Sequence, residues 1–177
     1  MGDGGREEAG RVVVIRRGGA ADAAAVRRLM AVAVRWLAER GRSAQWGSEV
    51  TPEREEQVTT FVRDHEAWVA EVDGAVAGVL TLTPESPDYV PGATEPELYV
   101  RLLLTDREHK GRGIGAALLE RAVERAREEG VGVVRVDCFA GLDDRLVDFY
   151  RGCGFVEQGR FERRGWRGCV LARRVEP

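Results

Sequence analysis

A glycine-rich loop stands between an apolar run and a long amphipathic helix in the second half of the chain. The loop spans residues 110–115 and reads KGRGIG, and the apolar run before it starts at Leu98. Glycines directly before a helix let the backbone approach a ligand closely, and the first amides of the helix lack internal partners and carry the positive end of its dipole. The loop is therefore predicted to bind a phosphate group, although a plain strand-to-helix turn also uses glycines.

Two nucleotide-binding motifs fit this loop poorly. The dinucleotide fingerprint needs three regularly spaced glycines after the first strand of a domain, and here the match is incomplete and the strand comes late in the chain. A Walker loop ends in Gly-Lys-Ser or Gly-Lys-Thr, which is absent.

A second segment downstream supports the phosphate interpretation. Residues 143–155 end in FYRGCGF, which places Tyr150 four residues before Gly154. Together with the glycine loop, this segment resembles the GNAT superfamily of N-acetyltransferases, and the resemblance covers Leu98 to Phe155. It implies an α+β fold with one central mixed, splayed sheet flanked by helices in a single domain, and acetyl-CoA as the cofactor.

The resemblance also implies where the cofactor binds. Its pantetheine arm is expected along residues 103–105, and its pyrophosphate on the backbone of residues 111–116. The family has Gln or Arg where this chain has Lys110, and Asn where it has Asp143. The expected cofactor-binding residues are Leu103, Leu104, Thr105, Lys110, Gly111, Arg112, Gly113, Ile114, Gly115, Ala116 and Asp143.

Acetyl transfer to an amine needs an acid for the departing thiolate and a base for the amine. Tyr150 matches the family tyrosine near the cofactor sulfur, and a phenol is protonated at neutral pH; a place in an aromatic core pair is its alternative role. For the base, the family often uses the central strand, where this chain has Tyr99 and Arg101, predicted by alternation to share a face with Leu103. Arginine cannot act as a base, which leaves Glu97 as the nearest carboxylate. Glu97 could instead be an exposed charge at the strand end, and an ordered water could take the proton.

In this family the first two helices and their connecting loop form one wall of the acceptor pocket. The candidate acceptor-binding residues are Trp36, Gln45, Trp46, Tyr89 and Arg101. Trp46 could equally belong to the core. Arg101 suggests a carboxylate on the acceptor, or else a structural acid as its partner. An aromatic wall with one cation would favour an amine bearing a carboxylate or an aromatic ring over a polycation.

The predicted function is that of an acetyl-CoA-dependent N-acetyltransferase that acetylates a primary amine of a small molecule by direct attack. Two alternatives remain. One is a CoA-binding regulatory or sensor module without turnover, and the other is a protein or peptide N-terminal acetyltransferase.

The composition agrees with a globular domain. Of 177 residues, 44% are hydrophobic and 32% charged, and 27 basic against 30 acidic side chains leave a net charge of −3, so no nucleic-acid or membrane partner is predicted. Three cysteines without Cys-x-x-Cys spacing and two distant histidines imply no metal. Without a signal sequence, the chain is expected to be cytoplasmic, as a monomer or homodimer.

The pattern of the chain predicts its elements. Residues 1–10 are expected to be a disordered tail and 11–177 the acetyltransferase domain. Asp22 is predicted to begin the first helix and Thr51 the second. The Asp73-Gly74 pair is predicted to form the turn of a hairpin. The expected strands are 12–15, 68–72, 75–80, 98–105, 133–139, 155–161 and 166–173, and the expected helices are 22–41, 51–62, 114–130 and 142–151.

Overall fold

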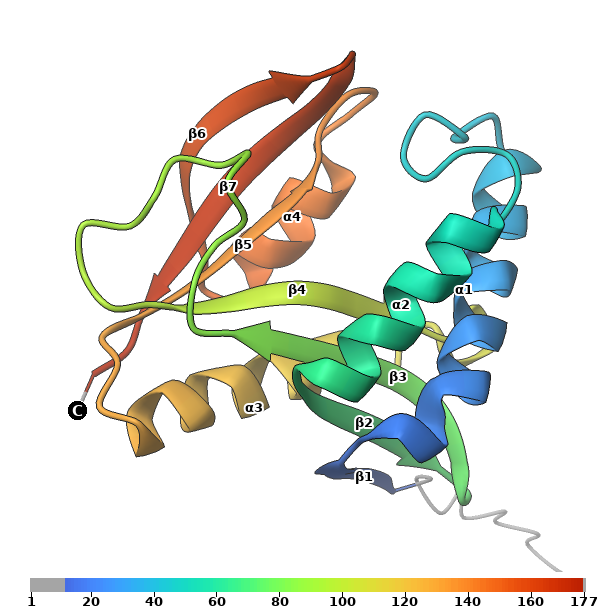
Figure 1. Ribbon diagram of the computed structural model, residues 1–177, viewed down its shortest axis with the longest axis horizontal. Coiled ribbons are helices and arrows are strands. Elements are labelled where there is room, and N and C mark those ends of the chain that lie inside the picture. The colour runs from blue at the N-terminus through green and yellow to red at the C-terminus, as the bar shows by residue number, and fades with distance from the viewer. Residues whose placement is uncertain (1–11, 177) are drawn as a thin grey trace, which may run out of the picture.

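The computed structural model describes residues 12–176, so the tail expected over residues 1–10 lies outside the described part. Seven strands form one sheet in the order β1-β2-β3-β4-β5-β7-β6 (Figure 1). The strands are β1 (Val13–Arg17), β2 (Glu66–Val72), β3 (Ala75–Thr83), β4 (Leu98–Thr105), β5 (Val133–Phe139), β6 (Val156–Arg163) and β7 (Trp166–Arg174). The helices are α1 (Ala23–Ala38), α2 (Pro52–Asp64), α3 (Ile114–Glu128) and α4 (Arg145–Gly152), with 3-10 turns η1 (Ala20–Asp22) and η2 (Arg107–His109). The predicted α+β order is confirmed.

Local chemistry sets several of these boundaries. The Thr51 side chain accepts a hydrogen bond of 3.2 Å from the Arg54 amide at the start of α2, as a capping threonine does. Asp73 and Gly74 turn between β2 and β3 with φ of 52° and 78°. Paired positive φ values match the twist of the flanking strands, which is why an Asp-Gly pair favours this hairpin.

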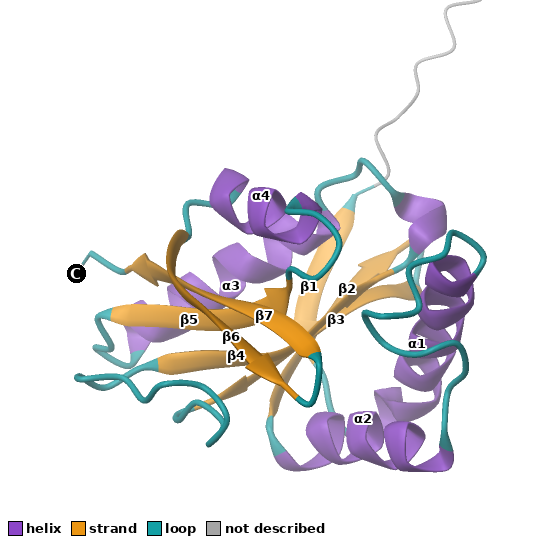
Figure 2. Ribbon diagram, turned by 90° about the horizontal axis from the view of Figure 1, so that it is seen from above, coloured by secondary structure: helices purple, strands orange, loops and turns teal. Residues whose placement is uncertain are grey.

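Helices cover both faces of the sheet (Figure 2). Helices α1 and α2 lie on one face, where Leu29, Val34 and Val58 join Leu102 and Leu104 of β4 in one core cluster. Helices α3 and α4 lie on the other face, where the core includes Leu118, Val147 and Tyr150. The central strands are therefore covered by helices on both faces of the sheet.

Strands β4 and β5 separate after a short parallel contact. They pair only at Leu98–Val100 with Val134–Val136, although both strands continue well beyond. Figure 1 shows them adjacent at one end and diverging toward the other. Past Val100, the edge of β4 that faces β5 therefore has amide and carbonyl groups without a strand partner. This confirms the predicted splay.

A β-bulge at Arg101 changes which side chains share a face of β4. Leu82 of β3 pairs with Val100 and Thr81 pairs with Leu102, which leaves Arg101 as the extra residue. Beyond the bulge, Leu103 packs on the α3 side of the sheet. Arg101 instead lies over the ring of Phe61 in α2. The prediction that Leu103 shares a face with Tyr99 and Arg101 is wrong, because strict alternation fails at a bulge.

Helix α4 begins at Arg145 rather than at the predicted Leu142. The reason is Asp143, whose carboxylate accepts hydrogen bonds from Arg42 and from the Arg145 amide. These bonds hold residue 143 in the loop ahead of the helix.

Candidate active site

The glycine loop has the geometry of a phosphate-binding site. Gly111 and Gly113 have φ of 84° and 70°, and no atom lies within 4 Å of where a Cβ would stand on either. The first backbone bond of α3 runs from Ala117 to the Gly113 carbonyl, so the preceding amides of the helix point to the open end without an internal partner. With Lys110 and Arg112 alongside, this cradle fits the pyrophosphate of acetyl-CoA.

Gly115 serves packing as well as backbone approach. A Cβ there would stand 2.9 Å from Cζ of Phe149 and 3.6 Å from Cγ2 of Thr105. Phe149 belongs to α4 and directly precedes Tyr150. The absence of a side chain at Gly115 thus lets the phosphate loop and the tyrosine helix come together.

The residues expected along the pantetheine arm divide between two roles. Leu104 is buried in the core beneath α1 and α2. Ile114, expected at the pyrophosphate, is the first residue of α3 and is buried in the core on the other face of the sheet. Leu103 and Thr105 are only partly buried. The open backbone of the splay, and not the leucine side chains, supplies the polar groups that suit pantetheine amides.

Asp143 is engaged by the chain itself. Arg42 donates to both carboxylate oxygens at 2.7 and 3.1 Å, and these bonds hold the pKa of Asp143 at about 2. The pair joins the loop after α1 to the loop before α4. At this position the family has an Asn that contacts the cofactor, whereas Asp143 forms an ion pair across the edge of the site.

Tyr150 is almost fully buried in α4. Its ring meets Phe149 and Phe155 edge-on, with centroid separations of 5.1 and 5.7 Å. Burial raises the pKa of its phenol well above the ordinary value, and the nearby Cys138 and Asp137 add to the effect. No hydrogen bond to its hydroxyl is formed within residues 12–176. The hydroxyl therefore keeps its proton and has it available for a ligand.

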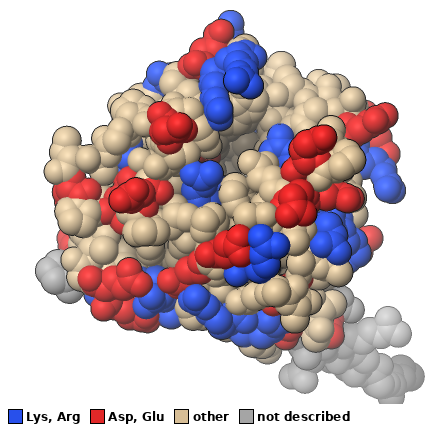
Figure 3. All heavy atoms as spheres, in the orientation of Figure 1, with Lys and Arg blue, Asp and Glu red and all other residues tan. Residues whose placement is uncertain are grey.

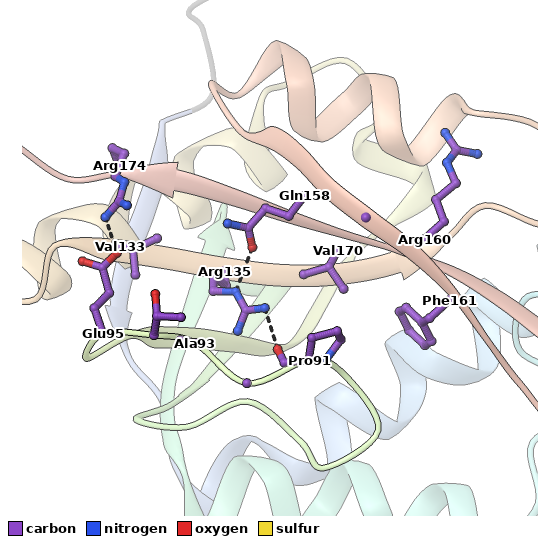
Figure 4. A pocket seen from close by; sticks show the side chains of 13 residues that line it. Pro91, Ala93, Glu95, Val133, Arg135, Gln158, Arg160, Phe161, Val170 and Arg174 are labelled. Atoms are coloured by element: carbon purple, nitrogen blue, oxygen red, sulfur yellow. Dashed lines mark hydrogen bonds and ion pairs between the residues drawn. The ribbon is translucent and has the colours of Figure 1, made fainter.

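Glu97 is committed to a structural ion pair. One oxygen accepts 2.8 Å from Arg135 and the other accepts 2.8 Å from the Ser86 amide, and the Glu97 and Arg135 side chains are each 6% exposed. Arg135 also donates to Gln158 and to the Pro91 carbonyl, at the wall of a cavity of about 280 Å³ (Figure 4). Glu97 was predicted to be a base or else an exposed charge at the strand end. The contacts instead show a buried residue that anchors the loop between β3 and β4.

Tyr99 points to a carboxylate that the sequence analysis did not select. Its hydroxyl donates 2.6 Å to Oδ1 of Asp137 on β5, one residue beyond the last β4–β5 pair. Burial raises the pKa of Asp137, while the Tyr99 hydrogen bond and the Arg101 charge act in the opposite direction. Tyr99 is fully buried and its own pKa is raised, so it is a proton donor that positions Asp137 and not a base.

Sequence reasoning had a signal for Asp137. Strand β5 reads VVRVDCF, and an acid in a strand buried on both faces carries a desolvation cost that calls for a reason. The sequence could not show that its partner is Tyr99, because the two residues lie 38 positions apart.

An aromatic row lines the α1 and α2 side of the open splay. Successive ring centroids of Tyr89, Phe161, Trp166 and Phe139 are separated by 6.0, 5.9 and 5.7 Å. Figure 3 shows this face of the molecule hollowed, with basic side chains gathered at the top, where the β6–β7 hairpin ends. Tyr89, predicted in the acceptor wall, belongs to this row, whereas the other three rings were not predicted.

Three other predicted acceptor residues have structural contacts. Trp36 lies beneath the guanidinium groups of Arg40 and Arg107, at 4.2 and 4.1 Å from its centroid. Trp46 packs against the core of α1 and α2. Gln45 is buried, and its carbonyl accepts 2.9 Å from Nε1 of Trp166. Of the predicted set, Tyr89 and Arg101 remain beside Asp137.

Within the described residues, no group of three or more His, Cys, Asp or Glu side chains is arranged to hold a metal ion. No helix in residues 12–176 is long and apolar enough to span a membrane.

Comparison with known proteins agrees with this geometry. The profile of the acetyltransferase (GNAT) family matches residues 31–155. The uncharacterized N-acetyltransferase YesJ of Bacillus subtilis is 27% identical over 143 residues, which are 78% of each chain. A GNAT-family acetyltransferase structure from Listeria monocytogenes superposes with a TM-score of 0.69 at 21% identity, covering 92% of this chain and 95% of that one.

A further structure shows the same fold with its ligand. The structure of yncA from Salmonella typhimurium, solved with its cofactor acetyl-CoA, has a TM-score of 0.64 at 18% identity and covers 93% of this chain and 94% of that one. The match of the family profile spans well over half of the sequence, and the splay and glycine loop are in place. The chain therefore belongs to the GNAT family of acetyltransferases, which transfer an acetyl group from acetyl-CoA to an amine.

Proposed function

We propose that the protein acetylates a primary amine of a small molecule by direct attack, with Asp137 as general base and Tyr150 as general acid. One observation carries the proposal: at the open end of the β4–β5 splay, Asp137 stands one residue beyond the last strand pair with its Oδ1 held by Tyr99, and the Tyr150 phenol forms no hydrogen bond within residues 12–176. Acid and base groups of this kind beside a cofactor channel are the requirement for acyl transfer.

Bound acetyl-CoA supplies the thioester carbonyl that the amine attacks. The glycine loop and the first amides of α3 would hold its pyrophosphate, and the open edge of β4 would hold its pantetheine amides. The assigned groups are backbone groups, so the exchange of the family's Gln or Arg for Lys110 leaves them unchanged.

Asp137 has the properties of the base. An alkylammonium group with a pKa near 10.4 must lose a proton before its nitrogen can attack. Burial of Asp137 raises the affinity of its carboxylate for that proton. The bond from Tyr99 fixes Oδ1, and no second side chain in the described residues bonds to this carboxylate, so it can accept the proton and pass it to solvent.

Tyr150 has the properties of the acid. As the amine nitrogen bonds to the acetyl carbon, the carbon–sulfur bond breaks and the sulfur takes the phenolic proton. The proton that the new amide nitrogen loses then restores the phenol. The raised pKa of Tyr150 keeps the phenol protonated until sulfur carries charge.

A small acceptor is supported by the way the acceptor side is enclosed. The loop between α1 and α2 is tied to the α4 side by Arg42 and Asp143, and to the β6–β7 hairpin by Trp166 and the Gln45 carbonyl. These two ties hold the loop against both of its neighbours, which favours a small acceptor over a peptide chain. A protein N-terminal acetyltransferase is the less favoured alternative.

We also propose a cytoplasmic location, where thiols stay reduced, because Cys138, Cys153 and Cys169 are all free. The protein is proposed to act there as a monomer or homodimer, without nucleic acid or membrane as a partner.

The test is release of free thiol from acetyl-CoA in the presence of amines, amino acids, aminoglycosides and peptides, with mass spectrometry to identify the acetylated product. Turnover of a small amine supports the proposal. Tight acetyl-CoA binding without turnover of any acceptor would instead indicate a sensor module, and turnover confined to peptides would indicate a protein acetyltransferase.

A further inference from the structure

Arg101 is a cation that makes no direct contact with an anion in the described part of the chain. Its side chain is partly buried at the β4 bulge, with the guanidinium over Phe61 at 5.2 Å from the ring centroid. Among residues 12–176 it forms no ion pair and no side-chain hydrogen bond. The structural acid considered as its partner is therefore absent from the described part of the chain.

Two other arginines around the site, Arg42 and Arg135, are satisfied by the protein. Arg42 has Asp143, and Arg135 has Glu97, Gln158 and the Pro91 carbonyl. The Arg101 guanidinium is partly buried and presents five N–H donors, none of which bonds to an acceptor within residues 12–176. Arg101 is thus placed to recognise a group that arrives with a ligand.

The base lies next to this cation. Asp137 accepts the hydrogen bond of Tyr99, which stands two residues before Arg101 on β4, yet Asp137 and Arg101 do not form an ion pair. A gap therefore separates one positive and one negative group on the same side of the sheet. A zwitterion with its ammonium group toward Asp137 and its anionic group toward Arg101 would give each side chain a partner of opposite charge.

We infer that the acceptor is an aminocarboxylate, a primary amine whose carboxylate is bound by Arg101. This inference rests on the proposed function and specifies its substrate class. A guanidinium binds a carboxylate through two parallel hydrogen bonds, which orients the molecule and brings its amine to the base. The aromatic row of Tyr89, Phe161 and Trp166 offers an apolar surface for the remainder of the acceptor, and the positive charge of Arg101 disfavours polycationic amines.

The test compares matched acceptors that differ only in the carboxylate. Phenylalanine is paired with phenethylamine and with phenylalanine amide, and histidine with histamine and histidine amide. Thiol release from acetyl-CoA gives kcat/KM for each, and calorimetry measures binding of the same compounds to the protein saturated with CoA. Binding is measured independently of turnover, so it shows whether the acceptor's carboxylate is recognised even if no acetylation occurs.

Three variants accompany the panel. Arg101→Gln removes the cation, Arg101→Lys keeps the charge without the planar pair of donors, and Arg54→Gln removes one partly exposed positive charge on α2. We expect Arg101→Gln to weaken binding and kcat/KM for the amino acid by about 10- to 100-fold, with Arg101→Lys between it and the parent. The decarboxylated amine should change less than threefold, and Arg54→Gln should match the parent.

The outcomes separate the two ideas. Preference for the amino acid that is lost in Arg101→Gln supports the inference, whether it is seen in turnover or in binding alone. Equal or better binding of the amine that lacks a carboxylate overturns it, even if acetylation proceeds. Carboxylate-dependent binding without any thiol release would leave the inference standing and reject the proposed function.

Discussion

Replacement of Asp137 by asparagine should remove the general base without removing the hydrogen bond from Tyr99. Asparagine keeps an oxygen that can accept the Tyr99 hydrogen bond of 2.6 Å, so the local packing should persist, but it cannot take a proton. Loss of a general base lowers turnover by about 10²- to 10⁴-fold. We expect kcat to fall within this range while the dissociation constant of acetyl-CoA changes less than threefold.

Stability should move in the opposite direction. Burial raises the pKa of Asp137, so the fold binds its proton more tightly than the unfolded chain does. The folded state is therefore penalised as pH rises from the unfolded value of 3.8 through the folded pKa, and the full penalty is present above the folded pKa. Asp137→Asn removes that penalty, and its melting temperature at pH 7 should equal or exceed that of the parent.

The pH dependence tests the role of Tyr99. The Tyr99 hydrogen bond lowers the pKa of Asp137, so Tyr99→Phe should raise it further. The acid limb of kcat/KM reports the pKa of the base in the free enzyme, and it should move to higher pH in Tyr99→Phe and vanish in Asp137→Asn.

The assay is thiol release from acetyl-CoA between pH 5 and 9, with Asp64→Asn, an exposed acid on α2, as the matched control. Asp137→Asn with more than a third of parental turnover would refute the assignment. An acid limb that stays in place in Tyr99→Phe would show that the titrating group is not Asp137.

Three further variants probe the rest of the site. Tyr150→Phe should lower kcat by about 10²- to 10⁴-fold with little change in the Michaelis constant for acetyl-CoA, because the proton is given up only at the transition state; a loss under threefold would leave Tyr150 a packing role. Gly115→Glu should nearly abolish acetyl-CoA binding in calorimetry, since its Cβ would stand 2.9 Å from Phe149 and its charge would repel phosphate, while circular dichroism keeps the helical signal; unchanged affinity would place the cofactor elsewhere. Glu97→Gln breaks a buried pair with Arg135, a loss of about 3–5 kcal/mol that lowers the melting temperature by about 6–20 °C. The folded fraction should stay active, and a large loss of kcat without destabilisation would return Glu97 to catalysis.

The sequence by itself determined the order of the elements and the shape of the glycine loop. Residues 98–105 and 133–139 form strands with the predicted bounds, and Thr51 and the Asp73-Gly74 pair act as predicted. These features depend on neighbours a few positions apart, through side-chain periodicity, a cap or a turn. The glycine loop likewise works through its own backbone, so local sequence suffices to predict its shape.

The tertiary structure decided the acceptor side. Alternation placed Tyr99, Arg101 and Leu103 on one face of β4, but the bulge at Arg101 arises from the register with β3, which no single strand specifies. Glu97 was predicted as the nearest base because its partner, Arg135, lies 38 positions away and could not be identified from the sequence.

Long-range pairs account for the rest. Tyr99 meets Asp137 across 38 positions, Arg42 meets Asp143 across 101, and the Gln45 carbonyl meets Trp166 across 121. Each contact exists only because the sheet brings β4, β5 and the β6–β7 hairpin beside the helices. Periodicity and spacing report which side of an element is buried, whereas the partner of a buried polar group depends on the packing of the whole chain.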